Sequence, residues 1–193
     1  MSIFVHLLAT LLQVAPVPPP VDQAQADCAS PSYADDMAVC GDQGLRELDR
    51  RMGAALPGAE ARTGYLIEPQ REWFRRSRAC STRKDQLACL RVAYRERIAV
   101  LAAARRPMPA SAAWQPCRRS ADRVAFVDGG IIVIRRAGGT YLASAATELH
   151  AWRPWLYATL DRAPDRSPRR IAFRWLDARK TDCTLQQPRS ANP

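Results

Sequence analysis

The spacing of apolar residues divides the chain into a helical part and a β part. Across residues 33–104, apolar side chains recur at three- and four-residue intervals, as they do on one face of an α-helix. Asp42 can cap a first helix, which we expect to end at Pro57-Gly58, and further helices are expected over 69–80 and from about Asp85. The side chains expected to face the core are Leu45, Leu48, Met52, Leu56, Trp73, Leu87, Leu90, Tyr94, Ile98 and Leu101. None of these helices could bury its apolar face alone, so the segment predicts a small helical domain.

Residues 117–185 show short β-branched runs that are separated by glycine pairs. The pairs Gly129-Gly130 and Gly138-Gly139 each stand between two such runs, which is typical of tight turns between antiparallel strands. The expected strands cover 122–128, 131–136, 140–142, 155–160 and 171–176. This pattern predicts a small antiparallel β module.

The first 26 residues have the features of an export signal. The apolar run over 3–14 is shorter than the ~20 residues needed to span a bilayer. A proline-rich stretch follows, and then Ala24-Gln25-Ala26, a small-x-small site of the kind that signal peptidase cuts. A buried apolar N-terminal helix is the alternative interpretation. We therefore expect a mature chain that starts at Asp27, has no transmembrane helix after cleavage, and is periplasmic or secreted.

All six cysteines follow the expected cleavage site. They are Cys28, Cys40, Cys80, Cys89, Cys117 and Cys183. An even number of cysteines in an exported chain predicts three disulfides, and no closely spaced pair suggests a zinc site. Cys117 and Cys183 bracket the expected strands and should pair. We expect Cys80–Cys89 across a short helix connection, which leaves Cys28–Cys40, although Cys28–Cys89 with Cys40–Cys80 remains open.

Together these patterns predict an α+β protein, with a small disulfide-bonded helical domain followed by a small antiparallel β module. A run rich in Pro, Ala and Ser joins the two parts, and proline in that run should end the last helix. The predicted boundaries are a signal peptide over 1–26, the helical domain over 27–104, a linker over 105–116, the β module over 117–185 and a flexible tail over 186–193.

The helical part also contains strings that carry a family resemblance. They are Gln70-Arg71-x-Trp73 and Cys89-Leu90-Arg91-x-x-Tyr94-Arg95-x-Arg97-Ile98. With four cysteines in order, residues 27–104 resemble the N-terminal domain of LprI-type lysozyme inhibitors, which are exported bacterial proteins. Two positions depart from the family pattern, because Ser77-Arg78 replaces an Arg-Asp pair and Gly53-Ala54-Ala55 replaces an aromatic residue. The resemblance implies a disulfide-bonded helical domain and a lysozyme as partner, and its motif residues are Gln70, Arg71, Trp73, Leu90, Tyr94 and Arg97.

The β module carries a much weaker likeness. Its bracketing cysteines and the Gly138–Tyr141 loop are similar to MliC-type lysozyme inhibitors, but Ala137 stands where that class has a serine. An unrelated β module is the competing interpretation.

Charge is concentrated in the second half of the chain. Residues 27–104 carry 13 basic and 11 acidic residues, whereas residues 105–193 carry 16 and 7. All but two of the 29 basic residues are arginine, which is typical of a GC-rich genome, so the arginine count alone does not indicate phosphate recognition. Net positive charge attracts anionic partners. From their turn and flanking positions, the candidate anion-binding residues are Arg135, Arg136, Arg169 and Arg170.

The sequence offers no combination of nucleophile, base and orienting group, and it contains only two histidines. We therefore expect no enzyme activity, catalytic residue, cofactor or metal, and export with disulfides disfavours a nucleic-acid partner. By resemblance, we expect a lysozyme-inhibitor-like binding protein of the bacterial cell envelope. The alternative is a basic envelope protein that binds anionic lipopolysaccharide, phospholipid or cell-wall polymer through its C-terminal half. The net charge of +10 favours this alternative, because it would repel the common basic lysozymes.

Overall fold

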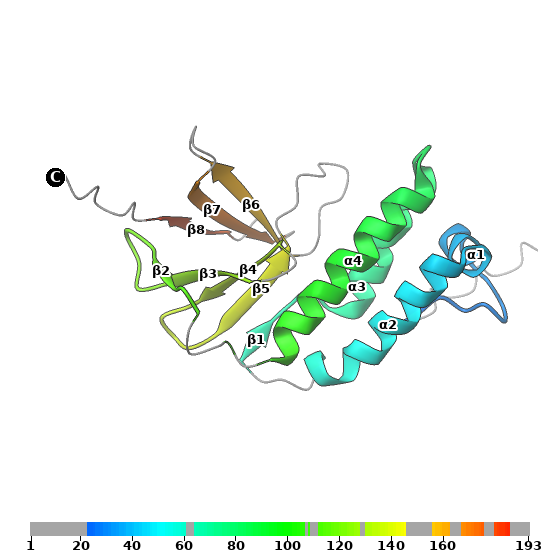
Figure 1. Ribbon diagram of the computed structural model, residues 1–193, viewed down its shortest axis with the longest axis horizontal. Coiled ribbons are helices and arrows are strands. Elements are labelled where there is room, and N and C mark those ends of the chain that lie inside the picture. Colours follow the sequence, from blue (N-terminus) through cyan, green and yellow to red (C-terminus); the bar gives the residue numbers. More distant parts are fainter. Residues whose placement is uncertain are drawn as a thin grey trace, which may run out of the picture.

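The fold is seen in a computed structural model, in which helices come first in the chain and two β-sheets follow (Figure 1). The structure describes residues 23–60, 64–106, 108, 112–127, 130–145, 156–162, 167–175 and 180–185. The predicted tail and residues 1–22 of the predicted signal peptide lie outside the described residues. The predicted α+β class is confirmed.

The helices gather at one end of the molecule (Figure 1). They are α1 (Ala34–Gly41), α2 (Gln43–Glu60), α3 (Gln70–Ser77), the 3-10 helix η1 (Arg78–Thr82) and α4 (Gln86–Arg105). The Trp73 and Tyr94 rings meet edge to face at 5.1 Å in the centre of their common core, and both side chains are buried. The predicted aromatic core positions are therefore correct.

Two local predictions for the helices differ from the structure. The Asp42 carboxylate accepts a hydrogen bond from the Leu45 amide at 2.8 Å, as expected for a cap, but α2 does not end at Pro57-Gly58. It continues to Glu60 because Ala59 and the residues before Pro57 pack into the core, and this burial outweighs the backbone hydrogen bond that proline cannot donate. Leu87, expected to face the core, is 41% exposed because the contacts of α4 with the helical core begin only at Cys89 and Leu90.

The strands form two sheets. The first sheet has the order β1 (Tyr65–Leu66), β5 (Tyr141–Ala145), β4 (Ile131–Arg135), β3 (Arg123–Val127) and β2 (Gln115–Pro116). The second is antiparallel, with the order β6 (Leu156–Arg162), β7 (Pro168–Trp175) and β8 (Lys180–Thr184). Strands β3 to β7 correspond to the predicted ones, and Gly130 and Gly139 adopt positive φ at the predicted turns. Strands β1, β2 and β8 were not predicted.

The helical part and the β part share a core. Strand β1 comes from the helical part, yet it pairs in parallel with β5 and places Tyr65 beside Tyr141. Val100 of α4 packs in one cluster with the buried Ile131 and Val133 of β4. Strand β2 also occupies the end of the segment predicted as a linker. The first sheet is consequently mixed rather than antiparallel, and its helix-facing side is covered in part by α4.

The three predicted disulfides are present, with Cys28 bonded to Cys40, Cys80 to Cys89 and Cys117 to Cys183. The first two hold the helices. The third connects the two sheets, because Cys117 follows β2 and Cys183 lies within β8. Around this bond, the buried side chains of both sheets form a second core, which includes Ile134, Leu142, Ile171 and Phe173.

Candidate functional site

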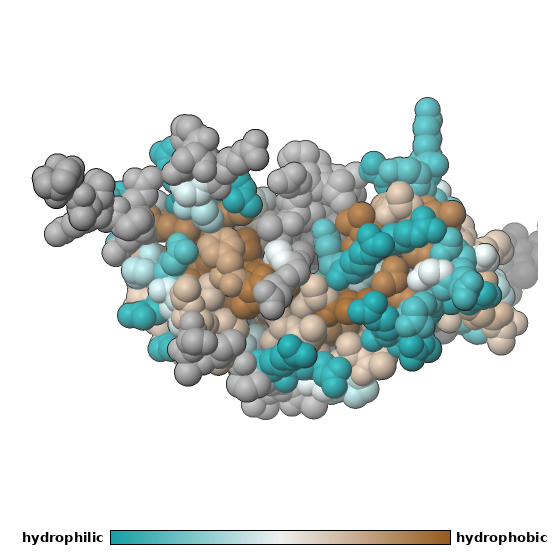
Figure 2. Space-filling view, in the orientation of Figure 1, coloured by the Kyte–Doolittle hydropathy of each residue, from teal (hydrophilic) through white to brown (hydrophobic). Residues whose placement is uncertain are grey.

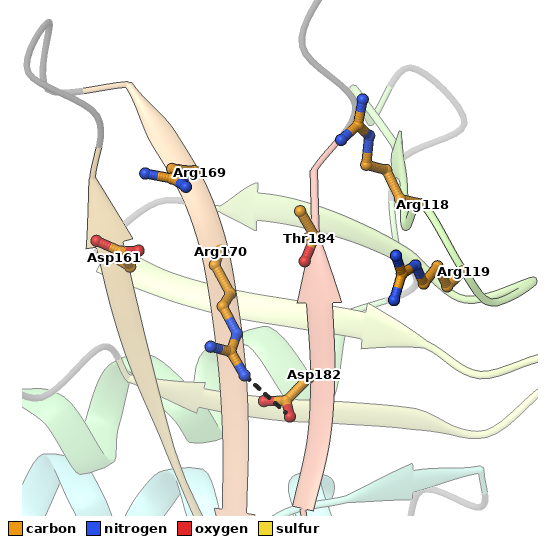
Figure 3. A pocket seen from close by; sticks show the side chains of 7 residues that line it. All are labelled: Arg118, Arg119, Asp161, Arg169, Arg170, Asp182 and Thr184. Atoms are coloured by element: carbon orange, nitrogen blue, oxygen red, sulfur yellow. Dashed lines mark ion pairs between the residues drawn. The ribbon is translucent and has the colours of Figure 1, made fainter.

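A cleft lies where the second sheet meets the loop that follows β2 (Figure 3). Its volume is about 560 Å³. The lining residues are Arg118, Arg119, Asp161, Arg169, Arg170, Asp182 and Thr184. Four of the seven are arginines, so the lining is polar and rich in positive charge.

The Cys117–Cys183 disulfide builds this cleft, because it holds the Arg118-Arg119 loop against β8. Two backbone hydrogen bonds support the same arrangement. The Arg118 amide donates to the Thr184 carbonyl at 2.9 Å, and the Leu185 amide donates to the Arg169 carbonyl at 3.0 Å. Arginines that lie about 50 residues apart in sequence are thus fixed on opposite sides of one strand.

The alternation of side chains along the strands directs polar groups into the cleft. Asp161, Arg170 and Thr184 are aligned across β6, β7 and β8. The adjacent row contains Ile171 and Cys183, which are buried against the first sheet. Successive side chains of a strand point to opposite faces, so the aligned polar row faces away from the core.

Asp182 pairs with two arginines of the second sheet. It accepts a charged hydrogen bond from Arg174 at 2.9 Å. It also forms an ion pair with Arg170 at 3.2 Å, which Figure 3 shows. Partial burial opposes ionisation of Asp182, but the hydrogen bond and charge of Arg174, aided by Arg170, outweigh it and lower the pKa of Asp182. Asp182 therefore stays ionised and offsets part of the positive charge at that end of the cleft.

The structure brings together only two of the four arginines predicted to bind anions. Arg169 and Arg170 line the cleft. Arg135 lies opposite Tyr141 in the first sheet, and Arg136 lies 3.6 Å from the Asp122 carboxylate and donates to the Thr181 hydroxyl at 3.2 Å. The cleft instead recruits Arg118 and Arg119, which the sequence reasoning missed. Arg118 and Arg119 directly follow Cys117 in the sequence, and Cys117 was expected to pair with Cys183. This expected disulfide was the signal that could have placed the two arginines beside the last strand.

The family-motif residues are mostly internal. Of the six, all but Arg71 are buried: Gln70, Trp73, Leu90, Tyr94 and Arg97. Arg97 donates to the Gln70 side-chain oxygen at 3.0 Å and to the Glu68 carbonyl at 2.7 Å, so it connects α4 to the start of α3. These contacts explain the motif as a requirement of the helical fold. They leave Arg71 as the motif side chain that is open to a partner.

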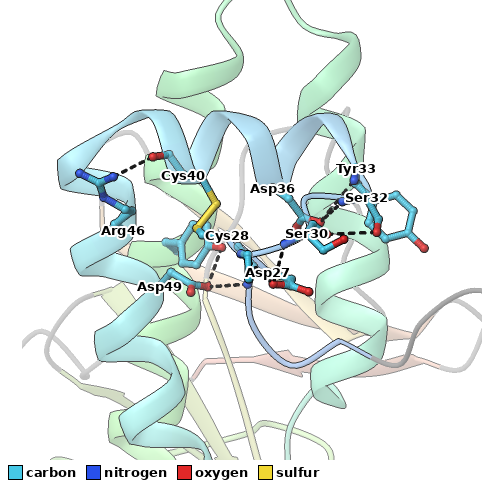
Figure 4. The surroundings of a disulfide bond; sticks show 12 residues. Asp27, Cys28, Ser30, Ser32, Tyr33, Asp36, Cys40, Arg46 and Asp49 are labelled. Atoms are coloured by element: carbon cyan, nitrogen blue, oxygen red, sulfur yellow. Dashed lines mark hydrogen bonds between the residues drawn. A yellow bond between two sulfur atoms is a disulfide. The ribbon is translucent and has the colours of Figure 1, made fainter.

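The predicted cleavage site lies beside Asp49 of α2 and the Cys28–Cys40 bond (Figure 4). Asp49 accepts hydrogen bonds from the Tyr94 hydroxyl at 2.9 Å and the Ala26 amide at 3.3 Å. Burial raises the pKa of Asp49, and these hydrogen bonds only partly counteract it. The Ala24 carbonyl also accepts a hydrogen bond from Gln70 at 2.7 Å, so the end of the predicted signal segment contacts the helical domain.

Within the described ranges, no group of three or more His, Cys, Asp or Glu residues is placed to hold a metal ion. None of the helices seen in that part of the chain is long and apolar enough to cross a membrane. Comparison of the chain with protein-family models, curated proteins and solved structures found no match. The resemblances to lysozyme inhibitors therefore stay predictions.

Proposed function

We propose that this protein is an exported, non-catalytic binding protein that binds anionic polymers of the bacterial cell envelope in its arginine-lined cleft. One observation carries the proposal: Arg118, Arg119, Arg169 and Arg170 line one cleft that a disulfide holds in shape. Guanidinium groups bind phosphate and carboxylate through paired hydrogen bonds, which makes arginine the common residue for such ligands.

The charges of the cleft support the same assignment. Four arginines face two carboxylates among its lining residues, so the site carries a net positive charge. Among the described residues, Arg118, Arg119 and Arg169 form no ion pair, and their guanidinium groups are available to a ligand. Lipopolysaccharide, anionic phospholipid and anionic cell-wall polymers all present the required phosphate or carboxylate groups.

The test compares double variants of the full chain that lose equal charge. Arg118→Ser/Arg119→Ser and Arg169→Ser/Arg170→Ser change the cleft, whereas Arg71→Ser/Arg75→Ser removes two exposed arginines from α3. Full-length variants are needed because α4 and the first sheet share a core.

Binding of fluorescent lipopolysaccharide, anionic vesicles and cell-wall polymer is measured by anisotropy at ~50 and ~200 mM salt. Each cleft variant should bind at least one of these ligands about tenfold more weakly than the wild type does, a loss of ~1.4 kcal/mol. The α3 variant should remain within about twofold, since long-range charge alone is screened. Equal losses in all three variants would show non-specific attraction and contradict the proposal.

Lysozyme inhibition is the second candidate, and a separate observation favours it. Met37 of α1 is 62% exposed, and Leu87 and Val92 of α4 are 41% and 39% exposed. Figure 2 shows apolar surface between the hydrophilic side chains over α2 and α4. Exposed apolar side chains of this size are common in protein–protein contacts.

A panel of basic and acidic lysozymes tests this candidate with the same proteins. Inhibition that survives both cleft double variants but is lost in Met37→Ser/Val92→Ser would support it. If every lysozyme keeps full activity in the presence of wild-type protein, the candidate is rejected.

A further inference from the structure

We infer that the cleft binds a ligand unit with two anionic groups joined by a hydroxylated spacer, as in a polyol phosphate or sugar phosphate polymer. This inference rests on the proposed function and specifies its ligand. It derives from the unequal distribution of charge between the two ends of the cleft.

The four arginines of the cleft form two separate pairs. Arg169 and Arg170 lie on β7, on one side of β8. Arg118 and Arg119 lie in the loop held on the other side of β8, and Thr184 stands between the two pairs (Figure 3). Since neighbouring strands are ~4.8 Å apart, the two pairs are separated by about two strand spacings, or ~10 Å. This separation is between the backbones of the two pairs, and a ligand with two anionic groups can place one group at each pair.

The two ends also differ in net charge. Neither Arg118 nor Arg119 forms an ion pair with the two lining carboxylates, whereas Asp182 pairs with arginines of β7. At the β7 end, Asp182 pairs with Arg170, and Asp161 lies directly across from Arg170 in the sheet. The first end therefore attracts an isolated anion more strongly, because the two carboxylates offset much of the positive charge at the second end. The second end adds to the affinity for a ligand with two anionic groups. Once the first group is bound at Arg118 and Arg119, the second group is held near Arg169 and Arg170 at a high effective concentration.

The groups between the two ends favour a hydroxylated spacer. On β8, between the two pairs, the Thr184 hydroxyl can donate and accept a hydrogen bond, and the Asp182 carboxylate can accept one. Hydroxyl groups of a sugar or polyol supply the matching donors and acceptors. A volume of about 560 Å³ is within the range of clefts that hold one small-molecule unit, so the site fits one repeat with its two flanking anions.

Calorimetric titration of the full-length protein with four probes tests the inference. The probes are inorganic phosphate, glucose monophosphate, glucose bisphosphate and hexanediol bisphosphate, which lacks the hydroxyl groups. We expect glucose bisphosphate to bind at least tenfold more tightly than glucose monophosphate, and hexanediol bisphosphate to bind severalfold more weakly than glucose bisphosphate. Vesicles with cardiolipin, two phosphates joined by glycerol, should compete with glucose bisphosphate if the natural source is a lipid headgroup. Binding of the bisphosphate without vesicle binding assigns it to a soluble or wall polymer.

The two double variants separate the ends of the cleft. Arg118→Ser/Arg119→Ser should weaken the binding of every probe, whereas Arg169→Ser/Arg170→Ser should weaken the bisphosphates and leave glucose monophosphate within twofold. Equal affinity for mono- and bisphosphate, or equal losses in both variants with the monophosphate, would overturn the inference. If the inference is overturned but both double variants still weaken the binding of lipopolysaccharide or wall polymer, the proposed function stands. If no anionic ligand responds to either double variant, both are overturned.

Discussion

Replacing Asp182 with asparagine should strengthen anion binding, although it removes an ion pair. Asp182 holds Arg170 at 3.2 Å and Arg174 at 2.9 Å, so a ligand anion must compete with it for Arg170. Asparagine keeps the shape of the side chain and one acceptor oxygen but removes the negative charge. The change therefore tests competition by the charge with little change in packing.

The magnitude follows from the geometry of the cleft. A unit charge ~8 Å from a bound anion contributes about 0.5 kcal/mol in water and ~2 kcal/mol at an effective dielectric constant of 20. The Asp182 side chain is 29% exposed and the cleft is open to solvent, so the lower half of this range applies. We expect the affinity for glucose bisphosphate to rise about two- to eightfold. The free energy of unfolding should fall by no more than ~1 kcal/mol, as is usual for partly exposed ion pairs.

The assay is calorimetric titration at low and moderate salt, with urea unfolding as the check on folding. Glu72→Gln is the matched control, because Glu72 pairs with Arg71 and Arg75 on α3 and its replacement changes the net charge equally. The control should shift the affinity by less than twofold. If Asp182→Asn binds the bisphosphate no better than the control does, Asp182 does not compete with the ligand. If it binds more weakly, Asp182 orients Arg170 for binding, and the reasoning is refuted.

Three further substitutions test the account of the fold. Burial raises the pKa of Asp49 above 3.8, so the folded state binds a proton at Asp49 more tightly than the unfolded chain does. The free energy of unfolding should therefore fall as the pH rises through the folded-state pKa of Asp49. Asp49→Asn should flatten this pH dependence in urea titrations from pH ~4 to ~7. Arg97→Met should cost ~3 kcal/mol because it removes the charged hydrogen bonds to the buried Gln70 oxygen and to the Glu68 carbonyl. Unchanged stability with altered lysozyme inhibition would instead mark Arg97 as a contact residue. Val133→Ala should cost ~2 kcal/mol and lower the melting temperature of helices and sheets together in circular dichroism, whereas an unchanged helical transition would contradict a shared core.

Elements with a strong local pattern were predictable from the sequence. Strands β3 and β4 flank a glycine pair, and α3 begins directly after Pro69, so both signals lie within a few residues. Strand β1 has only two residues, and its partner β5 lies some 75 residues away, which leaves no local pattern. The end of α2 was misplaced because burial of Ala59 outweighs the local effect of Pro57.

The cleft was predictable only in part, because some of its residues are marked by a local pattern and others are brought in by contacts between distant segments. Arg169 and Arg170 were selected from their flanking position, which is a local property. Arg118 and Arg119 join them through contacts between distant segments, among them the Cys117–Cys183 bond and the pairing of Cys117 with Leu185. Arg135 and Arg136 have the same local character as Arg169 and Arg170, but sheet pairing places them elsewhere.

The central claim is that anions bind between the two arginine pairs, and side-chain NMR tests it most directly. Glucose bisphosphate is titrated into full-length protein while the Nε–Hε resonances of the arginines are followed, with assignments from single Arg→Lys variants. The account predicts saturable shifts at Arg118, Arg119, Arg169 and Arg170, with Arg71 and Arg75 unchanged. Equal, non-saturating shifts at all exposed arginines, or shifts confined to Arg71 and Arg75, would contradict it.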